Sequence, residues 1–345
     1  MKKLQFTAAV FMLALASCSE KEEVKLPSIE NEPIVVHATS EGSSTRTALT
    51  GDDFTQVVWQ TGDAMNFHPC YLENGKITSK VPGDATLQQG TKLVTTGSGS
   101  SADFVTEDGS EVPTTTTIGT ETADANTYLA ITPYLDNEGT ASSKIKLANV
   151  DSSTRGTISF TMPTTQMYVE NSYDPAVAFA FAKSTDVGNM KFSNQFGVLR
   201  LNITGTTEQK VTSISVTSVS ASGYLSGTVN ACTVEEYEAG SKLAVSGTKS
   251  QTITMTCGEG VALSSEPTMF NIVLVPFTGV TVDITYSDGT EETVLSKVTN
   301  SPIERSVLTN MPVIDLTLED LGGGTESEGS NSTEDMEGSE GTWEE

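Results

Sequence analysis

The chain has 345 residues, enough for two domains of ordinary size. Its formal net charge is −26, which excludes nucleic acid as a partner because phosphate recognition needs clustered Lys and Arg side chains. Beyond the N-terminal leader, no apolar run has the length of a membrane-spanning helix.

The N-terminus has the organisation of a bacterial lipoprotein signal. Lys2 and Lys3 precede an apolar core over residues 4–16, and the run 15–18 ends in Cys18. Such a core is typical of an exported leader and too short for a stable membrane anchor. We expect residues 1–17 to be removed and Cys18 to be acylated, with each buried methylene contributing about 0.8 kcal/mol. An ordinary signal peptide with a chance cysteine is the alternative.

Residues 18–46 are predicted to form a polar tether. This segment is charged and lacks periodicity, except for a strand-like run over residues 33–38. Arg46, the first arginine of the chain, lies in a stretch of small polar residues (43–47) that should be accessible to a protease. The alternative for Arg46 is an ordinary surface residue at the start of a strand.

Residues 47–321 predict an all-β fold. Short apolar or alternating runs follow one another with turn signals between them, which favours two consecutive β-sandwich domains. The runs cover residues 55–59, 64–68, 128–131, 157–162, 177–182, 191–197, 198–203, 211–216, 223–227, 251–256, 270–275, 280–286, 291–295 and 313–318. A polar stretch over residues 185–189 predicts the boundary, giving an N-terminal domain over 47–187 and a C-terminal domain over 188–321.

Four further local predictions follow from composition. The Gly/Ser/Thr-rich segments 95–101 and 113–122 are expected to be surface loops, and one short helix is expected near residues 233–239. Trp59 should anchor the first core, and Phe192, Phe196 and Leu199 the second. Gly197 is expected at a bulge or a close approach of two backbones.

Residues 322–345 are predicted to form a disordered acidic tail. They carry eight acidic residues and no basic one, and their Gly, Ser and Glu content offers little apolar surface for a core. A spacer or interaction tail is the alternative.

The chain offers no recognisable catalytic set. It has two histidines, His37 and His68, and lacks a Gly-x-Ser-x-Gly elbow, a His-Glu-x-x-His helix, a Cys-x-x-Cys pair and a phosphate-binding Gly-Lys-Ser/Thr loop. Asp52, Asp53 and Asp63 are interpreted as turn residues rather than calcium ligands. We therefore expect a protein that is not an enzyme, with no catalytic residue, no metal site and no cofactor.

Cysteine usage also bears on function. Without Cys18, the chain retains Cys70, Cys232 and Cys257, an odd number. Cys232 and Cys257 are close enough in sequence to close a short disulfide loop. Buried cysteines that act as small apolar side chains are the favoured alternative.

Several segments together resemble the fimbrillin superfamily of Bacteroidales, a family of lipoprotein pilins. The resemblance rests on Cys18 and on the order of the four segments that follow it: Thr45-Arg46-Thr47, residues 58–63, residues 192–201 and residues 223–227. It spans roughly residues 18–320. It implies two sandwich domains of Greek-key, transthyretin-like topology and a surface-exposed protein anchored by lipid to the outer membrane. Lys21-Glu22-Glu23 also resembles the surface-export signal of such lipoproteins.

The resemblance further implies an assembly mechanism. A trypsin-like protease would cut between Arg46 and Thr47, so that an N-terminal strand is lost and a strand of a neighbouring subunit fills its groove. Residues 313–318, with Val313, Ile314, Leu316 and Leu318, are the candidate donor strand. The implied partners are other pilin subunits and host or bacterial surface ligands.

Two other hypotheses remain open on the same fold. The first is an adhesin that does not polymerise or that binds glycans, for which Tyr71, Tyr134, Tyr168 and Trp343 are the candidate exposed aromatics. The second is an anchor or tip subunit that ends a filament.

Overall fold

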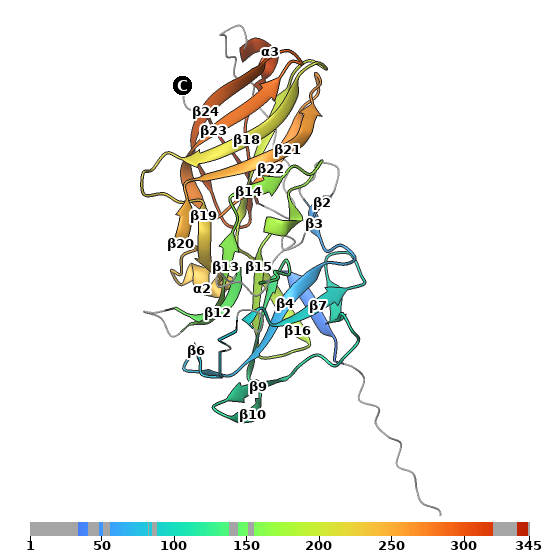
Figure 1. Cartoon of the computed structure of the whole chain (residues 1–345), viewed down its shortest axis with the longest axis vertical. Coiled ribbons are helices and arrows are strands. Elements are labelled where there is room, and N and C mark those ends of the chain that lie inside the picture. Colours follow the sequence, from blue (N-terminus) through green and yellow to red (C-terminus); the bar gives the residue numbers. More distant parts are fainter. Residues whose placement is uncertain are drawn as a thin grey trace, which may run out of the picture. The chain divides into compact units, whose positions relative to one another are not determined.

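The computed structural model describes residues 34–40, 48–50, 56–81, 83–84, 88–137, 144–150, 155–319 and 337–343. These residues belong to one compact unit. This unit is almost entirely β, as the alternating sequence pattern predicts (Figure 1). Among the described residues, no helix has the length and apolar character needed to span a bilayer.

Seven strands close into a barrel. In spatial order they are β1 (Val36–Ser40), β16 (Asn189–Asn194), β15 (Ala180–Ser184), β11 (Thr127–Thr132), β4 (Ala64–Cys70), β7 (Thr91–Thr95) and β8 (Ala102–Thr106). Trp59 is fully buried inside it and makes edge-to-face contacts with Phe104 and Phe192 at centroid distances of 5.1 and 5.6 Å. The prediction that Trp59 anchors the first core is confirmed.

Two five-stranded sheets form a sandwich. The first consists of β14 (Thr165–Met167), β21 (Thr252–Ala262), β18 (Lys210–Ser218), β23 (Phe277–Ser287) and β24 (Glu292–Ile303). The second contains β22 (Thr268–Leu274), β17 (Gly197–Thr204), β25 (Val307–Asn310) and β27 (Glu337–Glu340), with β26 (Ile314–Asp315) also paired to β17. Their inner residues share one core, in which Phe196 and Leu199 are buried as predicted.

A third sheet and three hairpins complete the β structure. The sheet contains β12 (Ile145–Asn149), β13 (Gly156–Met162), β19 (Ser226–Asn230) and β20 (Val245–Ser250). The hairpins are β2 (Ala48–Thr50) with β3 (Gln56–Val58), β5 (Leu72–Glu73) with β6 (Lys76–Ile77), and β9 (Thr115–Ile118) with β10 (Glu121–Asp124). The last hairpin corrects the expectation of a loop over 113–122, because exposed threonines pair there across the turn.

The helical content is small. Helix α2 (Val234–Glu238) begins with a capping box, in which the Thr233 hydroxyl accepts the Glu236 amide and the Glu236 side chain accepts the Thr233 amide. The predicted helix near 233–239 is therefore confirmed. The described residues also include the 3-10 turn η1 (Pro175–Val177) and helix α3 (Leu316–Glu319).

Strand pairing crosses the boundary expected near residue 187. Strand β16 follows that boundary in sequence but pairs with β15 and β1 of the barrel. Strands β13 and β14 precede it but pair with β19 and β21. Phe192, expected in the second core, accordingly lies in the barrel against Trp59. The polar stretch 185–189 is the tight connection between β15 and β16 rather than an interdomain linker.

The C-terminal residues differ from expectation in two places. Residues 313–318 were predicted as a strand, but only Ile314–Asp315 are extended and helix α3 begins at Leu316. The Asp315 carboxylate accepts both the amide and the hydroxyl of Thr317, which turns the chain. Within the predicted disordered tail, residues 337–343 are ordered: β27 pairs in parallel with β25, and the Gly341 amide donates to the Asn310 carbonyl.

Candidate functional site

The candidate site is the seat of β1 in the barrel wall. This strand is the first one described in the chain and lies between β16, to which it is parallel, and β8, to which it is antiparallel. It is therefore the element that closes the barrel, and without it β8 and β16 would each present an unpaired edge.

Strand β1 forms because its residues alternate between apolar and polar. Val36 and Ala38 point inward and are fully buried, whereas His37 between them is exposed. Val36 is paired with Phe104 of β8, and Ala38 lies between Ala102 and Met190. The slot therefore takes a strand with one medium-sized and one small apolar side chain, two residues apart.

Polar contacts hold the outer side of β1. The His37 amide donates to the Gly188 carbonyl (3.2 Å), and the His37 Nδ1 lies 2.8 Å from the Asp103 Oδ1 on β8. Both side chains are largely exposed, so this pair adds little to stability. The slot is thus specified by its ladder hydrogen bonds and its two inward side chains.

Residues 41–47 follow β1 and lie outside the described residues, as do Cys18 and the 21–23 signal. The predicted cleavage pair Arg46 and Thr47 is within that stretch, six positions after the end of β1. Its accessibility, like the acylation of Cys18, stays a prediction.

The predicted donor strand is folded into the chain's own sandwich. Ile314 and Leu316 are buried at 2% and 0% exposure, whereas Val313 is 39% exposed. Ile314 pairs with Ile203 of β17. The structure therefore does not bring residues 313–318 to the β1 slot of the same chain; any donation would be to another molecule.

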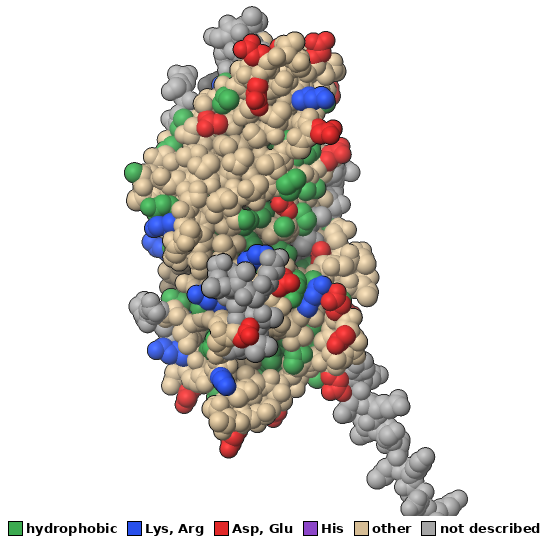
Figure 2. Space-filling model, in the orientation of Figure 1, with side chains coloured by type: hydrophobic (Ala, Val, Ile, Leu, Met, Phe, Trp, Pro, Cys, Tyr) green, Lys and Arg blue, Asp and Glu red, His purple; other side chains and the backbone are tan. Residues whose placement is uncertain are grey.

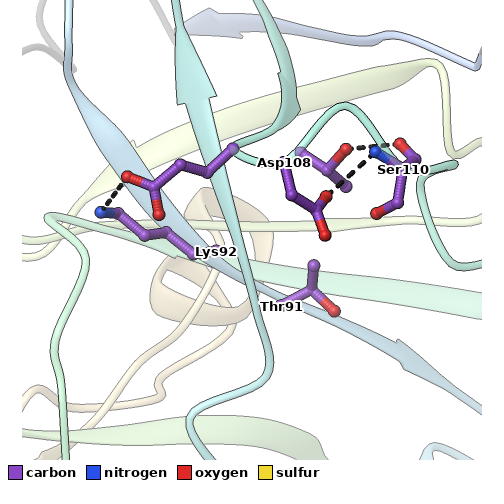
Figure 3. Close-up of a pocket in the computed structure, with 6 residues that line it drawn as sticks. Thr91, Lys92, Asp108 and Ser110 are labelled. Carbon is purple, nitrogen blue, oxygen red and sulfur yellow. Dashed lines mark hydrogen bonds and ion pairs between the residues drawn. The ribbon is translucent and has the colours of Figure 1, made fainter.

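A second hollow lies beside β7 and β8. It has a cavity volume of about 320 Å³ and is lined by Thr91, Lys92, Thr106, Glu107, Asp108 and Ser110. Figure 3 shows its charged groups already engaged: Lys92 Nζ lies 2.8 Å from Glu107 Oε1, and the Ser110 amide donates to Asp108 Oδ1. The hydrogen bonds from Ser110 lower the pKa of Asp108, as expected for a turn carboxylate. This hollow offers no catalytic arrangement.

The remaining candidate residues have structural surroundings. Cys70, Cys232 and Cys257 are buried and none of them forms a disulfide, so the favoured alternative of buried cysteines is confirmed. Burial raises the pKa of Cys70 to about 12 and of Cys257 to about 11. Asp63 accepts the Gln60 amide within a turn, as predicted. No group of three or more His, Cys, Asp or Glu side chains within the described ranges is placed to hold a metal ion.

The aromatic residues proposed for glycan binding are each half-buried. Tyr168 and Trp343 pack against the sandwich core, and the Trp343 Nε1 lies 3.4 Å from the Pro312 carbonyl. The Lys92 Nζ lies 5.2 Å from the centroid of the Tyr134 ring, and the Tyr134 hydroxyl accepts a hydrogen bond from the Gln89 Nε2 at 2.9 Å. The rings of Tyr134, Tyr168 and Trp343 are therefore engaged in these contacts.

Sequence reasoning missed the residues that line the β1 slot. Ala102, Phe104 and Thr106 of β8 alternate inward, which is the signal that could have identified this strand. Met190 was hidden because β16 begins in a polar segment that resembles a linker.

Neither a protein-family model nor a curated protein matches this chain. Among solved structures, the chain is similar to a "putative cell adhesion protein" from Bacteroides ovatus, with 14% identity and a TM-score of 0.43 over 82% of this chain and 92% of that one. A protein of the same description from Bacteroides uniformis has 12% identity and a TM-score of 0.42 over 84% and 94%. A fimbrial protein from Bacteroides ovatus has 9% identity and a TM-score of 0.31 over 90% of this chain and 51% of that one. All three likenesses are distant.

Proposed function

We propose that this chain is a lipid-anchored cell-surface subunit of a fimbria, assembled by exchange of β1 for a strand of a neighbouring copy. The observation that carries the proposal is the position of β1. The strand closes the barrel through backbone pairing on both sides and two buried side chains, and the next barrel strand along the chain, β4, begins only at Ala64. Cleavage at Arg46 would separate it from the barrel. The role is structural and needs no cofactor.

The donor in this proposal is the segment 313–318. In an extended conformation, Ile314, Leu316 and Leu318 project to one face, which matches the two-residue spacing of Val36 and Ala38 in the slot. Strand β27 is a poorer donor, because Glu337–Glu340 contains no apolar side chain. Donation requires residues 313–318 to leave β17, so buried Ile314 and Leu316 must exchange one core for another.

An arginine-specific protease tests the proposal. The chain has four arginines. Arg155 and Arg200 are buried at 9% and 5% exposure, and Arg305 is half-buried and donates to the Asn194 carbonyl, so brief digestion of the folded full chain should cut first at Arg46. The new N-terminus should be Thr47, and the cut protein should form ladders on a mildly denaturing gel. The Arg46→Gln variant, which keeps every described contact, should remain intact and monomeric.

Two results of this digestion would contradict the proposal. Cleavage at Arg46 that leaves β1 bound and the protein monomeric would overturn strand exchange, and resistance of Arg46 would overturn processing. Lipid anchoring is tested separately, since Cys18→Ala should release the protein from membranes.

One observation favours a filament-ending or non-polymerising role as the second candidate. In this molecule β1 fills its slot, Ile314 and Leu316 are buried, and β27 pairs with the edge of β25. These strand partners all come from the same chain. A chain that keeps this arrangement after exposure to the protease would serve as an anchor, a tip or a separate adhesin.

A further inference from the structure

One face of the sandwich carries hydroxyl groups where an acidic surface would be expected. We name as the hydroxyl face the outward residues from Thr252 to Thr256 of β21 together with the residues paired beside them on β14, β18, β23 and β24. On β18 these are Ser213, Ser215 and Thr217, which alternate with buried Ile214 and Val216.

The hydroxyl face is almost free of charge. Its one charged residue is Asp283, whose carboxylate accepts the Ser296 hydroxyl at 2.5 Å. Other hydroxyls bond to each other across strands, Ser215 to Thr254 at 3.0 Å and Thr217 to Thr252 at 2.9 Å. In Figure 2 the surface over β18, β21 and β23 is mostly tan, whereas acidic groups gather nearer the ends of the molecule.

Apolar side chains lie at opposite edges of this face. Met167 on β14 and Val294 on β24 are 53% and 57% exposed. They belong to the same cross-strand row, because Met167 pairs with Thr256, Thr256 with Ser213, Ser213 with Thr285, and Thr285 with Val294. Central strand β18 lies two strands from each edge.

We propose that the hydroxyl face binds the hydroxyl face of a second copy of this chain. A two-fold axis parallel to β18 would place Met167 of each copy over Val294 of the other, as an isologous interface requires. The same operation superposes the central strands, so Thr217 faces Thr217. Because the chain carries a net charge of −26, a face with a single charged residue is where two copies meet with least electrostatic repulsion.

The size of the face predicts weak association. Five strands about 4.8 Å apart, over five residues of about 3.4 Å each, give an area on the order of 400 Å² per copy. A standard stable interface buries about 800 Å² per partner. The dimer should therefore be reversible. Flat hydroxyl rows without an aromatic side chain favour a second sheet over a glycan, which is usually held in a concave site with aromatic lining.

Sedimentation velocity on the full chain with Cys18→Ser, which removes the lipid, tests this interface. The sedimentation coefficient should rise as the protein is concentrated from about 10 µM to about 1 mM, the range for a small interface. Thr217→Glu should weaken association at least tenfold. Thr248→Glu, the same change on exposed β20, is the matched control and should leave it unchanged.

Charge pairing makes the test specific to the two-fold arrangement. The Thr217→Glu and Thr217→Lys variants should each be monomeric on their own, but an equimolar mixture of the two should associate, because opposite charges then meet at the axis.

If Thr217→Glu fails to fold, Ser296→Glu on exposed edge strand β24 replaces it. A wild-type chain that stays monomeric at the highest concentration, or equal association of the face and control variants, would overturn the proposal. The interface does not depend on cleavage at Arg46, so its failure is separate from failure of the fimbrial proposal.

Discussion

At the scale of single residues, position 197 requires glycine because two backbone segments approach each other closely there. A Cβ atom at this position would collide with the Glu304 carbonyl oxygen and lie 3.0 Å from Ile303 Cγ2. Because the obstacle includes backbone, we expect Gly197→Ala to lower the free energy of unfolding by about 2 kcal/mol. Gly83→Ala, where a Cβ meets nothing within 4 Å, is the control and should change stability by less than about 0.5 kcal/mol in urea titrations.

His68 provides a pH dependence. It is 3% exposed, its Nε2 has no hydrogen-bond partner, and burial lowers its pKa from 6.5 to about 4. The unfolded chain therefore binds a proton more readily than the folded one. Stability is unaffected by this group above pH 6.5 and falls as the pH decreases toward 4, by up to about 3 kcal/mol.

The pH prediction is checked by urea unfolding at pH 7 and pH 4.5. His68→Gln should lose less stability between the two values than the wild type, whereas His37→Gln, at an exposed position, should retain the wild-type loss. Equal losses in the wild type and His68→Gln would show that other groups cause the acid sensitivity.

At the scale of elements, β1 stabilises the barrel through its inward side chains. Val36 is fully buried against the Trp59 core, and Ile34, two residues earlier, is 40% exposed. Val36→Ala removes two buried methyl groups and should cost about 2 kcal/mol. Ile34→Ala removes more atoms from an exposed position and should cost less than about 0.5 kcal/mol. Chemical denaturation compares them, and a larger loss in Ile34→Ala would mean that the register of β1 differs.

The sequence predicted those elements that have one buried face. Residues 198–203, 211–216 and 280–286 alternate cleanly and are strands β17, β18 and β23. Exposed elements were missed: the β9–β10 hairpin has no buried face and looks like a loop. Helix α3 was missed because residues 313–318 alternate like a strand. The hydrogen bond from the Thr317 amide to the Asp315 carboxylate turns the chain there, and such a bond leaves no periodic signal in the sequence.

The candidate site could be predicted only in part. The strand-like run 33–38 was visible from alternation, but its neighbours β8 and β16 are 60 or more residues away in sequence. Long-range pairing of this kind is set by the assembled core, in which Ala102 and Met190 flank Ala38. The local alternation of residues therefore predicts that β1 is a strand, but it does not predict that β8 and β16 are the strands with which it pairs.

At the scale of the whole molecule, the barrel interior around Trp59 is a core of its own, but residues on the other face of the barrel wall belong to the core of the sandwich. Leu129 and Ile131 of barrel strand β11 belong to the same buried cluster as Ile284 of β23. Phe160 of β13 packs against Phe179 at a centroid distance of 4.3 Å, and Lys183 of β15 contacts Glu236 of α2 at 3.0 Å. Apolar, aromatic and ionic contacts thus all join the barrel to the sandwich, which favours one cooperative folding unit over two independent domains.

We therefore expect a single unfolding transition for the chain. Calorimetry should give one peak whose calorimetric and van't Hoff enthalpies agree. Val36→Ala in the barrel and Ile284→Ala in the sandwich should both move that peak to lower temperature, because each weakens the same cooperative unit. With independent domains, each variant would instead shift one of two peaks and leave the other in place. Lys183→Met, which removes a half-buried link between β15 and α2, should broaden or split the peak if this contact couples the barrel to the sandwich.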